Sequence, residues 1–222
     1  MKDFGLFSID KYKAVIFDLD GTLIDSMGMW SEIDVEYLGK FGITVPKGLQ
    51  ETINGMQFSE IAVYFREAFG IEDSVEKIGD DWVKMARYKY EHTIPLREGA
   101  FEFLSFLKNR DIPCAIASSN HLELIEAILA RFGIRSAFEA IVTCDDACAG
   151  KPDPAVYLMA AEKLGVLPGD CLVFEDIPVG VLAGKRAGMD VCGVRDPHSA
   201  GLIAEVEELA DFAIDDFFPC IP

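Results

Sequence analysis

Short apolar runs alternate with longer stretches of helical period over much of the chain. The run KAVIF at residues 13–17 contains β-forming residues and stops abruptly at Asp18, which is typical of a buried strand in a parallel sheet. Similar runs recur at 112–117, 140–143, 171–174 and 191–194. Between them, from about residue 95 onward, apolar residues recur every three or four positions and predict helices. This alternation predicts a doubly wound α/β fold with helices on both faces of a parallel sheet.

Residues 26–94 interrupt the alternation. Their apolar positions, for example Ile33, Tyr37 and Phe41, follow a helical period and predict consecutive amphipathic helices without a strand. A helical block between the first two strands is an inserted domain at the strand ends, where open α/β sheets bind ligands. We therefore predict a catalytic core formed by residues 1–25 and 95–222, and an all-helical cap domain, residues 26–94, that acts as a lid.

Length and charge narrow the classes of function. The 222 residues are 50% hydrophobic, enough for one full core and a smaller accessory unit. A net charge of −18 without a basic patch repels nucleic-acid polymers and anionic membranes, so neither is expected as a partner. The same charge would repel a phosphorylated small molecule. A site for such a molecule would need its own positive charge, from a metal or from a few placed cations.

The chain carries no targeting or membrane signal. Its amino terminus lacks the features of a signal peptide, and no apolar run approaches the roughly 18 residues that span a membrane. The six cysteines form no CxxC pair, which favours a reduced, cytoplasmic protein. Cys144 and Cys148 are four positions apart, but no histidine accompanies them, so ordinary thiols are favoured over a soft-metal site.

Two carboxylates, Asp18 and Asp20, directly follow the first predicted strand. A polar turn is the simpler interpretation of such a pair taken alone. At the end of a buried strand, however, one carboxylate can attack phosphorus to form an aspartyl phosphate. The second can give a proton to the leaving oxygen and later take one from water. Gly21 would let the backbone approach the phosphate, and Thr22 would offer it a hydroxyl.

Three polar residues follow the second predicted strand. Ser118, Ser119 and Asn120 precede a helix that begins near His121, and a helix N-cap is their structural alternative. The amides of a helix N-terminus also bind anions, so capping and phosphate binding are compatible. We expect Ser118 to bind phosphate and Asn120 or Ser119 to cap the helix.

One lysine and two further acids complete the set. Lys151 lies between Gly150 and a proline in a turn, where it can supply the positive charge that the site needs. Glu175 and Asp176 end the strand at 171–174. Together with Asp18 they would repel one another strongly without a hard divalent cation. Mg²⁺ bound through few carboxylates and the substrate phosphate would resolve this repulsion.

With DLDGT, IASSN, GKPDP and FEDIPVG in this order, the chain resembles the haloacid dehalogenase superfamily, in the helical-cap subgroup that includes β-phosphoglucomutase. The resemblance covers essentially the whole chain and implies a Rossmann-like core. It implies that Asp18 is the nucleophile and Asp20 the general acid/base, an acid typical of the phosphatases and absent from the dehalogenases. The other roles implied are phosphate contacts from Ser118 and Lys151, and Mg²⁺ ligands from Asp18, the Asp20 carbonyl, Glu175 and Asp176.

The expected activity is Mg²⁺-dependent hydrolysis of a small phosphomonoester, such as a sugar phosphate or a nucleotide. Where β-phosphoglucomutase has a hinge histidine and a cap arginine, this chain has Trp30 and Phe58, and the loss of that arginine removes the partner of a distal phosphate. A β-phosphoglucomutase-like mutase remains the first alternative. A receiver-type phosphoacceptor is disfavoured by the length and the cap, and a non-catalytic phospho-ligand binding protein by the full set of competent residues.

Two interpretations remain for the cap side chains near the first strand: they face the substrate, or they pack the core of the cap. These residues are Met27, Met29, Trp30, Gln57 and Phe58. Asp25 and Ser26 are expected to cap the first cap helix. The expected partner is a small phosphorylated metabolite, and the expected assembly is a monomer or a weak homodimer.

Overall fold

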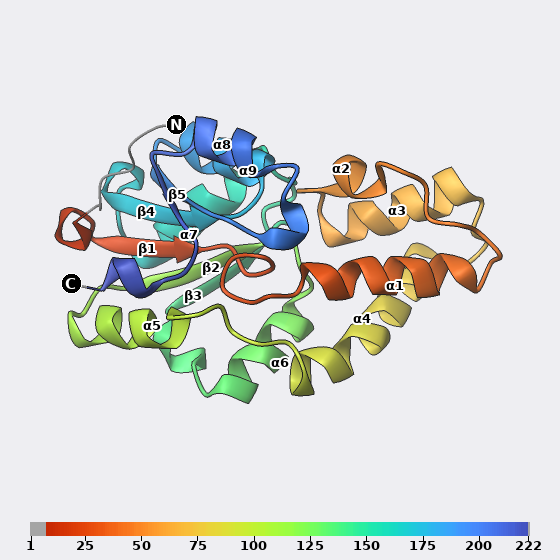
Figure 1. Ribbon diagram of the computed structural model, residues 1–222, viewed down its shortest axis with the longest axis horizontal. Helices are drawn as coiled ribbons and strands as arrows, with labels where there is room; N and C mark the ends of the chain where they lie inside the picture. The colour runs from red at the N-terminus through yellow and green to blue at the C-terminus, as the bar shows by residue number, and fades with distance from the viewer. Residues whose placement is uncertain (1–7, 222) are drawn as a thin grey trace.

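The computed structural model describes residues 8–221, and the six strands within them form one parallel sheet in the order β3-β2-β1-β4-β5-β6 (Figure 1). The strands are β1 (Ala14–Phe17), β2 (Cys114–Ser118), β3 (Ala140–Thr143), β4 (Cys171–Glu175), β5 (Asp190–Val194) and β6 (Phe212–Ile214). All neighbouring strands pair in parallel. The predicted doubly wound α/β fold is confirmed. The first five strands correspond to the predicted apolar runs, and β6 was not predicted.

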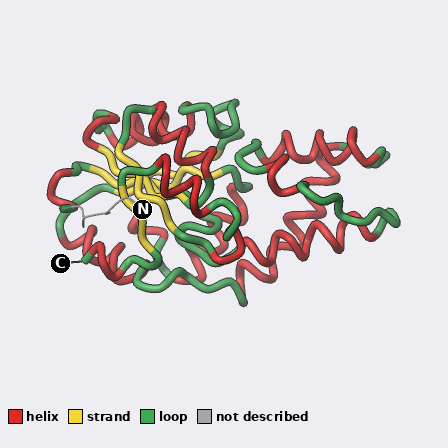
Figure 2. The backbone as a smooth tube through the Cα atoms, turned by 45° about the horizontal axis from the view of Figure 1, so that its top comes forward, coloured by secondary structure: helices red, strands yellow, loops and turns green. Residues whose placement is uncertain are grey.

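Helices cover both faces of the sheet, as Figure 2 shows. Because side chains alternate along a strand, Val15 and Phe17 of β1 face one apolar cluster, and Ala14 and Ile16 face the other. The first cluster includes α5 (Ala100–Asn109) and α6 (Leu122–Phe132). The second includes α7 (Ala155–Leu164), α8 (Pro178–Arg186) and α9 (Ile203–Leu209). This double coverage explains why the strands read as continuous apolar runs.

An aromatic cluster fixes the ends of β1 and β4 beside each other. The rings of Phe17 and Phe174 stack with centroids 5.2 Å apart, and Phe103 and Phe217 pack against both. All four side chains are fully buried, and burial of each contributes about 1.5–3 kcal/mol. Since Phe17 precedes Asp18 in the chain, this packing holds the carboxylate next to the end of β4.

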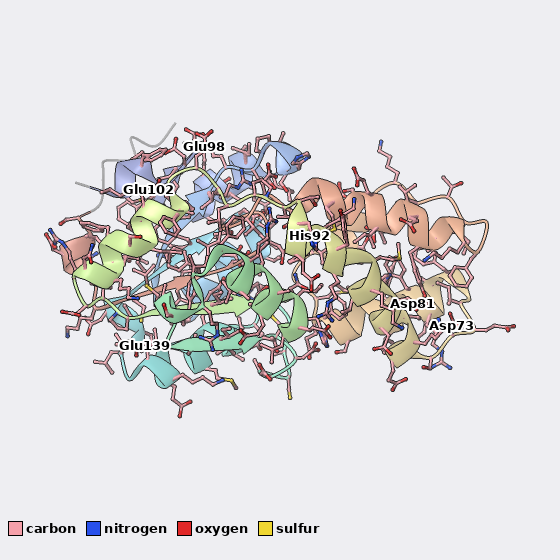
Figure 3. The ribbon with its side chains drawn as sticks, turned by 90° about the horizontal axis from the view of Figure 1, so that it is seen from below. Asp73, Asp81, His92, Glu98, Glu102 and Glu139 are labelled. Carbon is pink, nitrogen blue, oxygen red and sulfur yellow. The ribbon has the colours of Figure 1, made fainter. Side chains whose placement is uncertain are left out.

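The cap consists of the first four α-helices after β1: α1 (Met27–Gly39), α2 (Leu49–Ile53), α3 (Phe58–Phe69) and α4 (Val75–His92). The structure, which describes every residue of this stretch, contains no strand there, so the predicted helical insertion is confirmed. Seen from below, α4 runs from Asp81, near the far end of the cap, back to His92 beside the core (Figure 3). The cap therefore projects from the carboxyl edge of the sheet.

Two smaller expectations can be compared with the structure. All six cysteines are free, with Cys144 buried and Cys148 exposed, which agrees with ordinary thiols. Within residues 8–221, no helix combines the length and the apolar character needed to cross a membrane.

Candidate active site

The four polar clusters, far apart in sequence, meet at the carboxyl ends of β1, β2 and β4. They form the core wall of a cavity of about 140 Å³ whose opposite wall is the cap. The predicted residues in this wall are Asp18, Asp20, Ser118, Ser119, Asn120, Lys151 and Asp176. The order of the strands reverses between β1 and β4, which is where doubly wound sheets bind their ligands.

Lys151 supplies a buried positive charge at the centre of this wall. Its Nζ lies 2.7 Å from Oδ1 of Asp18 and 2.5 Å from Oε1 of Glu175. Burial of the ammonium works to lower its pKa, but the two carboxylates outweigh this and raise the pKa of Lys151 well above its usual range. The side chain is therefore a permanent cation, as expected from its place in an acidic protein.

Glu175 is held on both carboxylate oxygens. Besides Lys151, Oε1 accepts a hydrogen bond from the hydroxyl of Tyr157 at 2.6 Å. Oε2 accepts from the backbone amides of Asp176 and Ile177. The closest ligand atoms of Asp18, Glu175 and Asp176 lie within 4.8 Å of one another. Glu175 thus belongs to the acidic group while serving as the anchor of Lys151.

Asp176 has the features of a metal ligand. Its Oδ1 accepts a hydrogen bond from Thr22 at 3.0 Å, whereas its buried Oδ2 has no hydrogen-bond partner among the described residues. Burial, followed by the nearby Asp18, raises the pKa of Asp176 well above its usual range. Burial also raises the pKa of Asp18, to about 7, against the opposing effect of Lys151. A buried carboxylate oxygen without a donor fits a cation ligand, because such an atom is costly to bury alone.

Gly21 and Thr22 have contacts other than those expected. Gly21 has a φ of +84°, and a Cβ there would lie 2.1 Å from Oδ2 of Asp176. Its carbonyl accepts a hydrogen bond from Arg97 at 2.8 Å. The hydroxyl of Thr22 is fully buried and donates to Asp176. Both residues therefore shape the acidic cluster, and neither is part of the cavity lining.

Asp20 is turned towards the cap and accepts several hydrogen bonds. Oδ1 accepts from Ser26 at 2.6 Å, from Nε1 of Trp30 at 3.0 Å and from the hydroxyl of Tyr90. Oδ2 accepts from Nδ2 of Asn120 at 2.6 Å. Burial, with Asp20 adjacent, raises the pKa of Tyr90 well above its usual range, so Tyr90 stays a phenol that can donate. Three elements therefore fix the orientation of Asp20: the loop after β2 and the cap helices α1 and α4.

Of the expected helix caps, Ser26 does lie at the N-cap of α1, whereas neither Asn120 nor Ser119 is the N-cap of α6. The N-cap of α6 is His121, whose Nδ1 accepts from the amide of Glu123, while the side chain of Asn120 turns to Asp20. Ser119 lies near the carbonyl of Gly55 in the cap, at 3.4 Å. Ser26 occupies the N-cap position of α1 without a capping bond, because its hydroxyl donates to Asp20. Polar side chains near the starts of these helices therefore hydrogen-bond to active-site groups instead of capping the helices.

Both interpretations of the cap side chains apply, to different residues. Met27, Trp30 and Phe58 line the cavity. Met29 is buried in the apolar core, and Gln57 forms a capping box at the start of α3. The cavity also contains polar cap residues that sequence reasoning did not find, namely Asp34, Gln50 and Asn54. The pattern around Asp34 shows only an acid within an amphipathic helix, which gives no sign of burial.

Three comparisons with known proteins agree with this geometry. The chain matches the model of the haloacid dehalogenase-like hydrolase family over residues 12–188. It is 31% identical over 201 residues to validoxylamine A 7'-phosphate phosphatase of Streptomyces hygroscopicus subsp. limoneus, covering 89% of this chain and 92% of the relative. It is also 31% identical over 190 residues to hexitol phosphatase B of Escherichia coli K12, covering 84% and 85%.

Solved structures show the same fold. The crystal structure of β-phosphoglucomutase from Clostridium difficile matches with a TM-score of 0.78 at 22% identity, over 92% of this chain and 91% of that one. At this identity the likeness concerns the fold and leaves the choice between hydrolysis and isomerisation to the site itself.

Proposed function

The chain belongs to the haloacid dehalogenase-like hydrolases, and from this premise we propose that it hydrolyses a small phosphomonoester through a phosphorylated Asp18. One observation carries the proposal. Asp18 and Asp20 lie together on the wall of the cavity, beside the buried cation Lys151 and the unpartnered oxygen of Asp176. This arrangement offers a nucleophile, a proton donor and places for positive charge around one phosphate.

The reaction follows from the hydrogen bonds of the two aspartates. Lys151 binds Oδ1 of Asp18, and Oδ2 of Asp18, without a hydrogen-bond partner among residues 8–221, attacks phosphorus. As this O–P bond forms, the ester P–O bond breaks and Asp20 gives its proton to the leaving alcohol. Asp20 then takes a proton from water, which attacks the aspartyl phosphate and releases inorganic phosphate and Asp18.

Mg²⁺ fits the acidic cluster. Asp18, Asp176 and the backbone carbonyl of Asp20 would hold it, with Glu175 beside them in the same cluster. When bound, it offsets the negative charge of the substrate phosphate and of the carboxylates. The support from this structure is the orphaned Oδ2 of Asp176, together with a donor set made only of oxygen atoms.

Phosphate contacts come from Lys151 and Ser118. The hydroxyl of Ser118 lies on the cavity wall and accepts the amide of Asn120 at 3.1 Å, which leaves its proton for an anion. Asn120 donates a hydrogen bond to Asp20, and Ser119 donates one to the carbonyl of Gly55 in the cap. The backbone of Gly21 and the hydroxyl of Thr22 act through Asp176, by shaping the cluster that the phosphate approaches.

Hydrolysis is favoured over a mutase reaction by the charges of the cavity. Among the described residues that line the cavity, Lys151 is the one cation, and it forms an ion pair with Asp18. Trp30 and Phe58 are on the cap side, and neither can bind a second phosphate by charge. A mutase that works through a bisphosphate needs such a partner at the end of the substrate remote from Asp18.

The names of the relatives support a phosphorylated carbohydrate or a similar polyol derivative as the substrate class. The cap wall, rich in apolar and aromatic side chains, suits the carbon face of such a molecule. The free cysteines are consistent with action in a reducing compartment such as the cytoplasm.

The decisive experiment measures phosphate release from sugar phosphates, nucleotides and small phosphorylated acids, with and without Mg²⁺. The Asp18→Asn protein is the blank, and its circular dichroism establishes that it is folded. We expect Mg²⁺-dependent release by the wild type and a loss of at least about 10³-fold in the variant. Residual turnover near the wild-type rate in Asp18→Asn would exclude the covalent route. A product that keeps its phosphate after rearrangement would establish a mutase.

A further inference from the structure

Asp34 is a buried carboxylate in the cap wall of the cavity. Its side chain belongs to α1, and the residue is only 7% exposed. Nε2 of Gln50, from α2, donates to Oδ2 of Asp34 at 2.5 Å. Within the described part of the chain, Oδ1 has no hydrogen-bond partner and no cation pairs with either oxygen. The cap thus presents one free acceptor to the cavity.

The apolar surroundings of Asp34 make its burial cost free energy that packing alone would not require. Apart from Gln50 and Asn54, the cap residues that line the same cavity are largely apolar or aromatic, among them Trp30, Ile33, Ile53, Phe58 and Trp82. Burial in these surroundings raises the pKa of Asp34 to about 7, and Gln50 opposes the shift only in part. An apolar residue would fill the same space without the cost of burying an unpaired acid. A ligand that brings a partner for Oδ1 of Asp34 would offset this cost.

The position of Asp34 fixes which end of the ligand it meets. Trp30 hydrogen-bonds to Asp20, at the phosphate end of the cavity. Asp34 is four residues further along α1 on the same face, one turn or about 6 Å away along the helix axis. A substrate whose phosphate lies against Asp18 therefore extends its alcohol portion along α1 towards Asp34.

We propose that Asp34, held by Gln50, selects substrates whose end remote from the phosphate carries a hydrogen-bond donor, a hydroxyl or an amine, and rejects those with a second phosphate. The inference rests on the proposed phosphatase function. A carboxylate is an acceptor, so it favours a donor and repels an anion. The aromatic rings beside it pack equally well against a sugar face or an ammonium group.

The test uses monophosphates of one chain length that differ only at the far end. Four- to six-carbon alkyl phosphates are compared with ω-hydroxyl, ω-amino and ω-phosphate versions, and kcat/KM is measured for wild type, Asp34→Asn and Glu36→Gln. Glu36 is an exposed acid on the same helix and controls for the loss of charge. In the wild type, we expect the hydroxyl or the amine to raise kcat/KM over the plain alkyl chain by about tenfold or more.

In Asp34→Asn, the preference for the amine over the second phosphate should shrink by about tenfold or more, while Glu36→Gln keeps the wild-type ratios. Ratios in Asp34→Asn within twofold of the wild type would overturn the inference. An amine preferred well above the hydroxyl would assign the selection to charge, and equal preference would assign it to hydrogen bonding.

Binding measurements separate this inference from the function on which it rests. Calorimetry of the same ligands with the Asp18→Asn protein, with and without Asp34→Asn, compares their affinities without turnover. If the ligands with an ω-donor bind more tightly but the wild type releases no phosphate, the proposed phosphatase function is refuted and the selection by Asp34 stands. Turnover of all ligands without an ω-donor preference would refute the selection alone.

Discussion

At the scale of single residues, Asp34 has a consequence for stability as well as for specificity. Its pKa of about 7 in the folded cap exceeds the 3.8 of an exposed aspartate, so the folded protein holds a proton that the unfolded chain has released between these values. Stability conferred by the protonated carboxyl is therefore lost as the pH rises from about 4 to about 7. An asparagine at position 34 does not ionise, so it causes no such loss of stability as the pH rises.

Asp34→Asn changes the free energy of unfolding by a different amount at each pH. We predict that this change is about 1–3 kcal/mol more stabilising at pH 8 than at pH 5. Urea unfolding of the wild type and the variant at both pH values measures this difference. Glu36→Gln, from the exposed side of α1, should follow the wild-type pH dependence. Parallel pH dependences for Asp34→Asn and the wild type would show that the carboxyl is not desolvated in solution.

Tyr90 is the second residue whose role depends on burial. Its hydroxyl donates to Asp20 and accepts from Nε1 of Trp30 at 3.1 Å and from Nδ2 of Asn120 at 2.7 Å. Tyr90 does not itself line the cavity, so we expect it to act on catalysis through the orientation of Asp20.

Tyr90→Phe should therefore lower kcat by about tenfold and leave KM within about twofold, because Asp20 loses a hydrogen bond that orients it for proton transfer while no contact with the substrate is removed. Steady-state kinetics on the best substrate of the panel gives both values. Tyr88→Phe, two residues earlier and 65% exposed, is the matched control and should behave as the wild type. An equal fall in kcat for both variants would point to a general disturbance of α4.

At the scale of elements, α8 is built around the carboxylate of Glu175. A Cβ on Gly180 of α8 would lie 2.0 Å from Oε1 of Glu175. Helix α8 can approach the end of β4 only because this position lacks a side chain. The small residue is therefore part of the support of Lys151, although it does not itself line the cavity.

We expect Gly180→Ala to displace Glu175 and thereby Lys151, with a fall in kcat/KM of about 10²-fold or more. The concentration of Mg²⁺ required for half-maximal activity should rise in the same variant. Gly39→Ala is the control, since a Cβ on Gly39 in α1 has nothing within 4 Å. That change should keep activity and stabilise by up to about 1 kcal/mol. Normal activity in Gly180→Ala would mean that α8 and Glu175 adjust without cost.

The sequence predicts the longer elements well and the short or partner-dependent ones poorly. The runs before Asp18 and Glu175 are continuous and apolar, so their strand character is unambiguous. Strand β6 has three residues, Phe212–Ile214, and within residues 8–221 it pairs with β5 alone, at the edge of the sheet, so its local signal is weak. The caps failed for a different reason. Serine and asparagine cap a helix by accepting a backbone N–H on the side-chain oxygen, and here the side chains of Ser26 and Asn120 are oriented by donating to Asp20.

At the scale of the whole molecule, the core half of the site is predictable and the cap half is not. Parallel strands bring Asp18, Ser118 and Asp176 to one edge whatever the details of packing. Tyr90 and Asp34 reach the site only through the angles at which α1 and α4 lie on the core. Helical periodicity places them on a face without saying what that face meets.

The cap also contacts the core through side chains outside the cavity. Ser59 of α3 donates to Asp145, and Arg87 of α4 pairs with Glu123. The loop that contains Gly55 also lies directly on the loop that carries Lys151. This close approach covers the cavity, and a closed cap excludes water during phosphoryl transfer.

Gly150 tests whether this closure matters, because a Cβ there would lie 2.8 Å from the carbonyl oxygen of Gly55. Its φ is not in the left-handed region, so alanine suits the core backbone and conflicts only with the docked cap. We predict that Gly150→Ala lowers kcat/KM by about 10- to 100-fold, since a displacement of about 1 Å is enough for such a loss. Small-angle X-ray scattering should show a larger radius of gyration for this variant. Gly201→Ala is the control, because a Cβ on Gly201 has nothing within 4 Å, and it should match the wild type in both measurements. Full activity with a larger radius of gyration in Gly150→Ala would mean that catalysis tolerates a cap held away from the core, and wild-type scattering would mean that the added methyl group is accommodated without moving the cap.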